Sequence, residues 1–591
     1  MKSFKNYIFL VKSFFSVGKS YSIMLFLSCL VSPILVMIDT TIIKFAIESL
    51  EKNRPFIESV CILCAYFFIA FLAHLASILL GRYSCVEIIK IKYKMNLYIY
   101  NKALRTDLEY CDDPEYYNNY SWAIQNYFSK SHDAIMLLTK CISVCFNILA
   151  LASIIISLDA FIIIISFVSV IIEIILSMLN NKLNYEQSLQ NIKLSRISSY
   201  IHRIFYQNEY SLDIRSIGIS NILFSKFRKN TDEQMSLQKK FRNKNALLSF
   251  ILHINPVLLF IITIIYLLFK GMKNSLQTSD FALLITASQN LTYQLSSLTS
   301  IFPELLKQGL FANKLLIFLN LESKIENTNN KMVLENSPTL IEIDNLNFKY
   351  PNTSEYILKN INLKINPKEK IAIVGENGAG KSTLLKLLLR LYDPSFGKIM
   401  FNGKDLKQYN TKSVRSNIGI SLQSTNIFAF TLKENILFDS FIENDQIDLN
   451  IKALLDELSM EKYDSKLDTE LTREFSENGE VPSGGERQKL GQIRVLHKYF
   501  PIYFFDEPTS SIDPLSEKKI MDIIFSKTQK STVVMIAHRL STIIDFDKIY
   551  VLKGGTIAEY GTHKELMEKR GLYFNMFSQQ ANAYTSSKEC L

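Results

Sequence analysis

The sequence has little proline, glycine and charge for its length. Its 591 residues include 13 prolines and 19 glycines, and 21% of the side chains are charged against 48% that are hydrophobic. Disordered chains combine high charge with few apolar residues, and collagen needs glycine at every third position, so both classes are excluded. Eight cysteines in so long a chain are too few for a small secreted fold held together by disulfides.

Two of the cysteines stand close together. Cys61 and Cys64 have the spacing of half a metal or redox site, but they lie in an apolar run and no second pair follows at ligand spacing. We therefore interpret them as buried apolar thiols.

The apolar residues are distributed unevenly. The mean hydropathy of +0.12 averages long apolar runs before about residue 310 and a C-terminal half with the pattern of a soluble α/β domain. Because a membrane-spanning helix needs about 20 mostly apolar residues, we predict a multi-domain protein, in which an all-α six-helix transmembrane domain precedes an α/β domain. The predicted spans are 21–45, 56–80, 134–158, 161–179, 246–269 and 281–306, and the last of them is the least apolar.

Lysine and arginine gather before the first span, after the second, and between the fourth and fifth. The positive-inside rule therefore predicts that both termini are cytosolic. The rule also accounts for the net charge of +10, so we expect a lipid bilayer and no nucleic acid as partner. The first span lacks a cleavage site and is expected to be retained. About twenty residues precede it in this sequence, so we expect no peptidase domain that trims a leader peptide there.

Two cytosolic connections, between spans two and three and between spans four and five, each exceed fifty residues. They have helix-compatible sequence with breaks at 111–117 and 211–218, which are either ordinary turns or elements that contact another domain. Polar side chains inside spans are costly and often functional. The candidates are Asp39, His74, Asn147, Glu173, His253 and Asn255. Glu173 and His74 are candidates for a substrate path, with structural pairing between helices as the alternative.

The C-terminal half begins after a polar linker. We predict domains at 1–325 (transmembrane), 326–339 (linker), 340–581 (nucleotide-binding) and 582–591 (tail). A strand, a glycine-rich loop and a helix follow one another around residue 380, in the order of a phosphate-binding loop. Backbone N–H groups of such a loop cradle phosphate, its lysine reaches the β and γ phosphates, and its serine ligates Mg²⁺. The predicted ATP-binding residues of the loop are Gly375, Glu376, Asn377, Gly378, Ala379, Gly380, Lys381, Ser382 and Thr383.

A second apolar strand, 502–505, ends in two carboxylates. Asp506 can hold Mg²⁺, and Glu507 can align or polarise the attacking water. Together with the loop at 375–383, this pair predicts a nucleoside triphosphatase. A helix also begins at Ser483-Gly484-Gly485-Glu486, where small residues can bind a second phosphate group. Since the domain already has one phosphate loop, this second surface is expected to serve the nucleotide of another copy.

These motifs in this order resemble the ATP-binding cassette (ABC) family, and the resemblance to its exporter half-transporters covers about residues 15–580. It implies that 375–383 is the Walker A loop, that Asp506 and Ser382 ligate Mg²⁺, and that Glu507 is catalytic. Ser483, Gly484, Gly485 and Glu486 would be the signature motif that contacts ATP held by the opposing subunit.

The same resemblance gives roles to single residues. Gln423 would contact Mg²⁺, His538 the γ-phosphate, Asp513 the opposing subunit and Tyr350 the adenine, while Glu477 and Gly479 resemble a loop that couples exporter domains. Without the motif order, Tyr350 would be an edge-strand aromatic, Gln423 a surface polar residue and His538 a loop histidine.

The signature departs from the family pattern. Pro482 stands where leucine is usual and Glu486 where glutamine is usual, so a negative charge near the nucleotide is expected to slow turnover. The resemblance also places a D-loop, a segment that faces the opposing subunit, at 510–513. It has Ser511-Ile512 where Ala-Leu is usual.

The resemblance implies ATP hydrolysis coupled to transport across a bacterial cytoplasmic membrane by alternating access, with ATP and Mg²⁺ as cofactors. Two copies would give twelve spans and two ATP sites, so we expect a homodimer, with a heterodimer as the alternative. The breaks at 111–117 and 211–218 would be coupling helices. The local sequences around Tyr350, at 375–380 and at 113–118 resemble those of exporters of lantibiotic and bacteriocin peptides, which predicts a peptide substrate. Multidrug or lipid export is the alternative, and an ATP-gated channel, a soluble cassette ATPase and an importer are the other classes.

Overall fold

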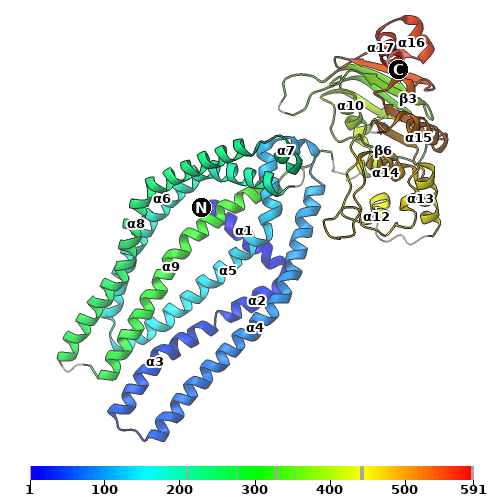
Figure 1. Cartoon of the computed structure of the whole chain (residues 1–591). Helices are drawn as coiled ribbons and strands as arrows, with labels where there is room; N and C mark the ends of the chain where they lie inside the picture. The colour runs from blue at the N-terminus through cyan, green and yellow to red at the C-terminus, as the bar shows by residue number, and fades with distance from the viewer. Residues whose placement is uncertain are drawn as a thin grey trace. The chain divides into compact units, whose positions relative to one another are not determined.

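The computed structural model describes residues 2–207, 210–273, 276–325, 331–351, 353–438, 445–510 and 512–586. The chain divides into two compact units (Figure 1). The first contains Met1–Lys102 and Asn119–Asn320, and the second contains Ala103–Asn118 and Leu321–Leu591. The second unit therefore includes a segment from the first of the two long connections that are predicted to be cytosolic. The predicted linker residues 326–330, the D-loop residue Ser511 and the tail residues 587–591 lie outside the described residues.

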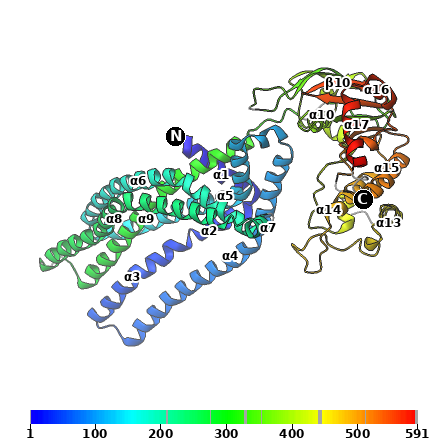
Figure 2. The same ribbon diagram turned by 45° about the horizontal axis from the view of Figure 1, so that its top comes forward.

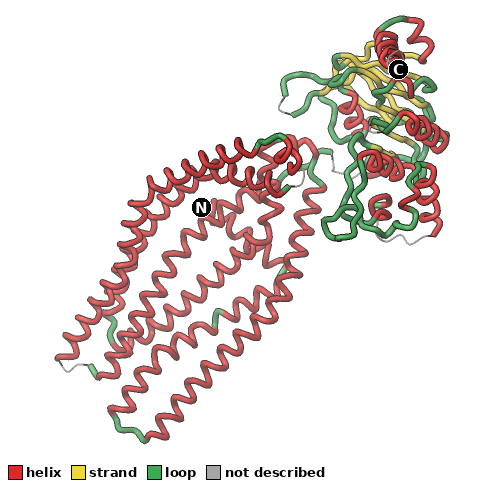
Figure 3. The backbone as a smooth tube through the Cα atoms, in the orientation of Figure 1, coloured by secondary structure: helices red, strands yellow, loops and turns green. Residues whose placement is uncertain are grey.

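The described residues of the first unit form helices joined by short turns and loops (Figure 3). Its long helices pack side by side: α6 lies along α8, and α9 packs against α1, α3 and α6. Two of the helices, α4 and α5, each have one end in the second unit. The helices are α1 (Lys2–Val17), α2 (Lys19–Ser28), α3 (Val31–Glu51), α4 (Phe56–Leu104), α5 (Pro114–Leu158), α6 (Phe161–Tyr206), α7 (Ser211–Ser216), α8 (Ser220–Met272) and α9 (Thr278–Leu319).

Among the described residues, five helical segments are long and apolar enough to cross a membrane, by length and composition. They coincide with the first five predicted spans and extend well beyond them, since α4 has 49 residues and α8 has 53. The sixth predicted span lies within α9, which has 42 residues but is not among the five. Serines, threonines and amides lower the apolar character of α9, so the count of six spans stays a prediction.

Three of these helices, α3, α8 and α9, contain a proline after their first residue. Pro33 lies in the first turn of α3, where its missing N–H leaves no helical hydrogen bond unmade, and the break between α2 and α3 precedes it. Pro256 and Pro303 lie inside α8 and α9. Each of them removes the N–H that would bond to the carbonyl four residues earlier. Those two carbonyls belong to Leu252 and Thr299.

Several polar side chains inside the spans tie helices together. The amide of Asn147 donates to Ser32 (3.0 Å) and to Gln294 (3.3 Å) and is 3% exposed. Asn255 donates to the hydroxyl of Ser169 at 2.8 Å. These contacts join α5 to α3 and α9, and α8 to α6. Asn147 and Asn255 therefore pair helices with one another, which is a structural role.

The second unit contains two sheets. A six-stranded sheet has the order β10-β9-β3-β8-β7-β6, with parallel pairing from β9 to β6. A four-stranded antiparallel sheet has the order β2-β1-β4-β5. The strands are β1 (Ile341–Phe348), β2 (Leu358–Ile365), β3 (Lys370–Gly375), β4 (Phe396–Phe401), β5 (Lys404–Asp405), β6 (Ile418–Ser421), β7 (Ile502–Asp506), β8 (Thr532–Ile536), β9 (Lys548–Lys553) and β10 (Thr556–Gly561).

Strands β7 and β8 are buried along their whole length, as expected for parallel strands covered on both faces. Because β3, β7 and β8 are parallel neighbours, their carboxyl ends meet at one edge of the sheet. Figure 2 shows the helices around this sheet from a second direction. They are α10 (Lys381–Leu388), α11 (Thr411–Ser416), α12 (Leu432–Leu437), α13 (Asp445–Glu457), α14 (Gly484–Leu496), α15 (Pro514–Lys527), α16 (His563–Lys569) and α17 (Leu572–Ser586).

Candidate nucleotide-binding site

The glycine-rich loop lies between the end of β3 and the start of α10. Gly380 has φ +99°, and a Cβ there would lie 2.6 Å from the side chain of Leu358. Gly375 has φ +149°, and a Cβ there would lie 2.2 Å from the carbonyl oxygen of Leu552. Only glycine fits both positions without strain. The backbone therefore turns tightly enough to bring its N–H groups to the start of α10, where an anion is favoured.

Lys381 is buried and folds back over this loop. Its Nζ donates to the carbonyl oxygens of Gly375 (2.8 Å) and Glu376 (3.1 Å). Burial lowers the pKa of Lys381, and the nearby carboxylates of Glu507 and Asp506 oppose that shift. A lysine held in this way, beside two acidic groups, is placed to meet phosphate oxygens.

Asp506, the last residue of β7, is 6% exposed, and its Oδ1 has no hydrogen-bond partner among the described residues. Burial raises the pKa of Asp506, while a hydrogen bond from Ser382 lowers it. A buried carboxylate oxygen without a donor, next to a serine hydroxyl, fits Mg²⁺, which takes oxygen ligands and shares them with substrate phosphates. No cluster of three His, Cys, Asp or Glu suited to a metal occurs in the described part of the chain. A Mg²⁺ site made of one carboxylate, one hydroxyl and the phosphate oxygens of a nucleotide does not require such a cluster.

Glu507 follows directly and has φ +49°, a conformation that non-glycine residues rarely adopt and that is found at functional sites. Gln423, which follows β6, donates from Nε2 to the Glu507 carboxylate at 2.8 Å. Gln488 of α14 donates to the Glu507 carbonyl oxygen at 2.7 Å. The structure thus brings Gln423, the predicted Mg²⁺ contact, to the carboxylate of Glu507. It also places Gln488 beside Glu507. The only hint of this in the sequence is that Gln488 follows the signature closely, in α14.

Tyr350 lies near the same loop. Its hydroxyl is 3.3 Å from the Thr383 hydroxyl, and Lys386 Nζ lies 5.4 Å from the ring centroid. The ring meets Phe348 and Tyr392 edge to face, with centroids 5.2 and 5.4 Å apart. Tyr350 is therefore part of an aromatic cluster at the phosphate loop rather than an isolated edge-strand residue.

Asp513 and His538 follow two neighbouring strands of the six-stranded sheet, β7 and β8. His538 follows β8 and is exposed, and its carbonyl oxygen accepts from Gln580 at 2.8 Å. The Asp513 carboxylate accepts from the Ser516 N–H at 2.9 Å and so caps α15. The predicted contacts of both residues with nucleotide or with a second subunit stay predictions.

The signature residues begin α14. Ser483 and Glu486 form a capping box, in which the Glu486 carboxylate accepts from the Ser483 N–H at 2.8 Å. Lys462 pairs with the same carboxylate at 2.6 Å. Burial raises the pKa of Glu486, but the bonds from Lys462 and Ser483 outweigh it and hold the pKa below its usual value. The negative charge noted in the sequence is thus neutralised by Lys462, for which the sequence offers no signal.

The predicted coupling loop precedes the signature. Glu477 is exposed, while Gly479 is buried so closely that a Cβ would lie 1.7 Å from the Thr472 carbonyl oxygen. Phe475, on the same loop, is 77% exposed. The glycine fixes the loop and leaves an acidic and an aromatic side chain projecting from it.

Within the second unit, the 103–112 segment contacts the ATPase core. The Tyr392 hydroxyl donates to Asp112 Oδ2 at 2.7 Å, where Asp112 ends the short helix η1 (Leu108–Asp112). Burial and this carboxylate raise the pKa of Tyr392. Since Tyr392 also touches Tyr350, a continuous path of contacts runs from the predicted adenine-binding residue to the first predicted coupling segment.

Residues 358–510 match the family described as ABC transporter. The chain carries an ABC transporter domain. The matched segment contains the Walker A loop, Gln423, the signature and the two carboxylates after β7. The predicted resemblance is therefore confirmed, while the roles of single residues within the ABC domain stay predictions.

Known proteins extend the likeness beyond this domain. The chain is 34% identical over 314 residues to the ATP-dependent lipid A-core flippase of Escherichia coli, which is 53% of each chain. It is 35% identical over 266 residues to the protein of the same name from Alkalilimnicola ehrlichii, 45% of each chain. The chain therefore aligns with about half the length of the curated relatives it matches. A solved structure, a bacterial Atm1-family ABC exporter with ATP bound, superposes with a TM-score of 0.79 at 21% identity, covering 96% of this chain and 99% of that one. This likeness confirms the fold class, a helical membrane region followed by an ABC domain.

Proposed function

We propose that this chain is half of an ATP-driven exporter of a cytoplasmic membrane, with both termini in the cytosol. The observation that carries the proposal is the convergence of Lys381, Asp506 and Glu507 at one edge of the sheet, with Gln423 bonded to the Glu507 carboxylate at 2.8 Å. The five apolar helices and the exporter fold support the membrane location and the direction of transport.

In this proposal the chain's own residues divide the chemistry. The loop N–H groups and Lys381 bind the ATP phosphates, and Tyr350 stacks on the adenine. Ser382 and Asp506 would hold Mg²⁺, together with Gln423, and the ion would neutralise developing charge on the phosphates. Glu507 orients and polarises the attacking water, held in place by Gln423 and Gln488. His538 contacts the γ-phosphate.

We propose a second copy of the chain as partner, because one chain leaves each site incomplete. No hydrogen bond among the described residues joins 483–486 to the loop at 375–383. The signature Ser483, Gly484, Gly485 and Glu486, with Asp513, would instead complete the ATP site of the partner. A heterodimer with another half-transporter is the alternative assembly.

For the substrate we propose an amphipathic, lipid-like molecule. The prediction of a peptide substrate depends on short stretches of similar sequence. In contrast, relatives that are 34–35% identical to this chain over about half its length are named lipid A-core flippases. Those names describe the relatives and favour the lipid or multidrug class over a peptide for this chain. An ATP-gated channel would pass its substrate passively, without using turnover.

The test of the chemistry is ATP turnover by the purified protein in nanodiscs. The Glu507→Gln variant keeps the size of the side chain and should bind ATP yet lose hydrolysis by at least about 100-fold, the scale on which positioned acid–base groups act. Near wild-type hydrolysis in Glu507→Gln would refute the assignment.

Composite sites are tested by mixing two inactive chains. Lys381→Ala disables one phosphate loop, and Ser483→Arg disables one signature, so each homodimer should be inactive. A mixed dimer keeps one complete site and should regain part of the activity. If mixing restores nothing although mixed dimers form, the two-chain site is wrong.

A further inference from the structure

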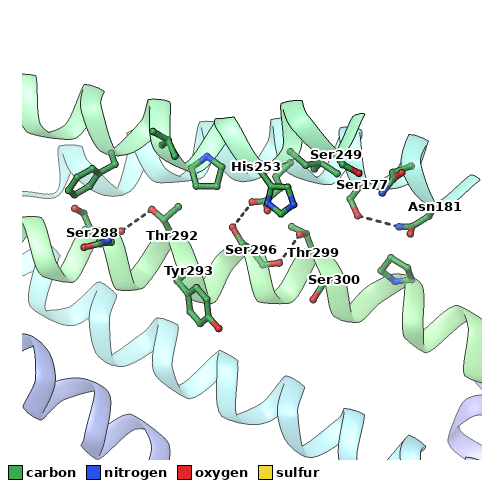
Figure 4. Close-up of a pocket in the computed structure, with 18 of the residues that line it drawn as sticks. Ser177, Asn181, Ser249, His253, Ser288, Thr292, Tyr293, Ser296, Thr299 and Ser300 are labelled. Atoms are coloured by element: carbon green, nitrogen blue, oxygen red, sulfur yellow. Dashed lines mark hydrogen bonds between the residues drawn. The ribbon is translucent and has the colours of Figure 1, made fainter. Parts of the chain in front are cut away.

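A polar groove of about 690 Å³ lies between α6, α8 and α9, within the first unit. Figure 4 shows side chains from these helices converging on it, with His253 of α8 opposite Ser296 of α9. Its volume is that of a site for a small organic molecule. His74, the other predicted substrate-path residue, is exposed on α4 and does not line this groove.

Glu173 is the charged centre of the groove. It lies on α6, is 7% exposed, and accepts a hydrogen bond from the Ser296 hydroxyl at 2.8 Å. No described lysine, arginine or histidine forms an ion pair with it. A carboxylate in a membrane segment is costly and is normally paired or functional. One neutral hydroxyl leaves most of the acceptor capacity of Glu173 unused.

The hydroxyls of α9 add further acceptors. Ser288, Thr292, Ser296 and Ser300 are spaced by four residues and so lie on one face of the helix. The hydroxyls of Ser288, Thr292 and Ser300 donate to carbonyl oxygens of their own helix at 2.8–2.9 Å. Each hydroxyl has one proton, so these three groups offer the groove lone pairs rather than donors.

The two helix prolines act in the same sense. Pro256 and Pro303 both line the groove, and so do Leu252 and Thr299, whose carbonyl oxygens lose their helical N–H donor to these prolines. Backbone acceptors without a helical partner therefore belong to residues at the groove wall. A ligand with N–H donors satisfies them.

The lining carries two carboxylates, Glu173 and Glu304. Its other titratable groups are His253 and Tyr293, and no lysine or arginine lines it among the described residues. Glu304 is paired with Lys307 at 3.6 Å near the surface, so the net attraction for a cation is centred on Glu173. Val257, Phe260 and Tyr293 form an apolar and aromatic part of the wall, which suits the body of an amphiphile. The faces of the two aromatic rings also attract cations.

We propose that this groove binds an amphiphile through a protonated amine, with the ammonium on Glu173 and its N–H groups shared with the acceptors of α9. The proposal rests on the export function above for the role of the groove and narrows its substrate to a cationic class. The shared chemistry, an amine on an apolar body, comes either from a lipid head group or from a free alkylamine.

The test is equilibrium binding of dansylcadaverine, a fluorescent primary amine, to the full-length protein in phosphatidylcholine nanodiscs without nucleotide. Its N-acetyl derivative has the same body but no charge. We expect the amine to bind at least tenfold more tightly than the acetylated probe, since a hydrogen bond to a charged group is lost in the latter. Equal binding of the two probes would overturn the proposal.

The variants are Glu173→Gln, which removes the charge and keeps the size, and Glu173→Asp, which keeps the charge. Glu173→Gln should bind the amine about tenfold more weakly, while Glu173→Asp should retain most of the affinity. Asp39→Asn is the matched control, because Asp39 is an exposed carboxylate of α3 outside the groove. If Glu173→Gln does not fold, Thr292→Val should still weaken binding several-fold. Unchanged affinity in the folded variants would contradict the amine site.

Competition separates the two sources of the amine. Displacement by dihexanoylphosphatidylethanolamine, but not by its choline analogue, assigns a lipid head group, and displacement by octylamine alone assigns a free amine. Displacement by neither contradicts the proposal. ATP hydrolysis is measured in the same preparations. Its absence in the wild type would contradict the export function, whereas loss of probe specificity alone would contradict only the amine site.

Discussion

Asp107 offers a prediction that the structure allows to be worked in detail. It lies between α4 and η1, is 1% exposed, and its carboxylate accepts hydrogen bonds from three donors. The donors are the Ser323 hydroxyl (2.5 Å) and the N–H groups of Lys324 (2.7 Å) and Ile325 (3.2 Å). One carboxylate thus ties the segment after α4 to the residues that lead into the ABC domain.

Asp107→Ala removes all three acceptor contacts. Water can reach a serine hydroxyl, but the two backbone N–H groups are held at a buried position, since Ile325 is 4% exposed. Each unsatisfied buried donor costs about 1–3 kcal/mol, so the junction should lose about 3 kcal/mol. That is roughly a 100-fold larger population of the locally open state.

Hydrogen exchange measured by mass spectrometry reads this directly in a peptide covering 321–325. Exchange there should accelerate by about two orders of magnitude in Asp107→Ala. Glu109→Ala is the control, because Glu109 is a carboxylate two residues away that holds none of these three donors. Unchanged protection of 321–325 in Asp107→Ala would refute the reasoning.

Two further predictions concern the signature and helix packing. Lys462→Ala leaves the Glu486 carboxylate unpaired and should raise the KM for ATP several-fold, and the additional Glu486→Gln change should restore it; a KM that stays at the wild-type value in Lys462→Ala would contradict the charge argument. Gly309→Ala would place a Cβ 2.1 Å from the Ser3 carbonyl oxygen and should lower Tm by a few degrees, at a cost of about 1–3 kcal/mol, whereas Gly271→Ala, with nothing within 4 Å, should not; equal Tm values would refute the packing argument.

Local patterns predicted the parts of this chain that local physics determines. Apolar runs longer than any strand predicted the first five membrane helices, and the strand–loop–helix order predicted the position of the loop at 375–383. The α9 helix is the exception among the predicted spans. Its hydroxyls and amides, which face a groove and other helices, make its sequence less apolar than that of the other five.

Contacts between distant segments could not be predicted in this way. The bond between Tyr392 and Asp112 joins residues 280 positions apart, and no periodicity links them. The pairing of Lys462 with Glu486 changed the interpretation of the signature from an unbalanced negative charge to a neutral pair. Asp107 similarly looked like one acidic residue of a cytosolic connection, because its three donors lie more than 200 residues away.

The most direct measurement of the central claim is transport by the purified protein in sealed liposomes, with ATP supplied only to the face that carries the ABC domains. A fluorescent amphiphile should accumulate in the lumen against its gradient, at a rate that follows ATP hydrolysis and vanishes in Glu507→Gln. Movement that is equally fast in Glu507→Gln, or that never exceeds equilibration, would contradict an exporter driven by this ATP site.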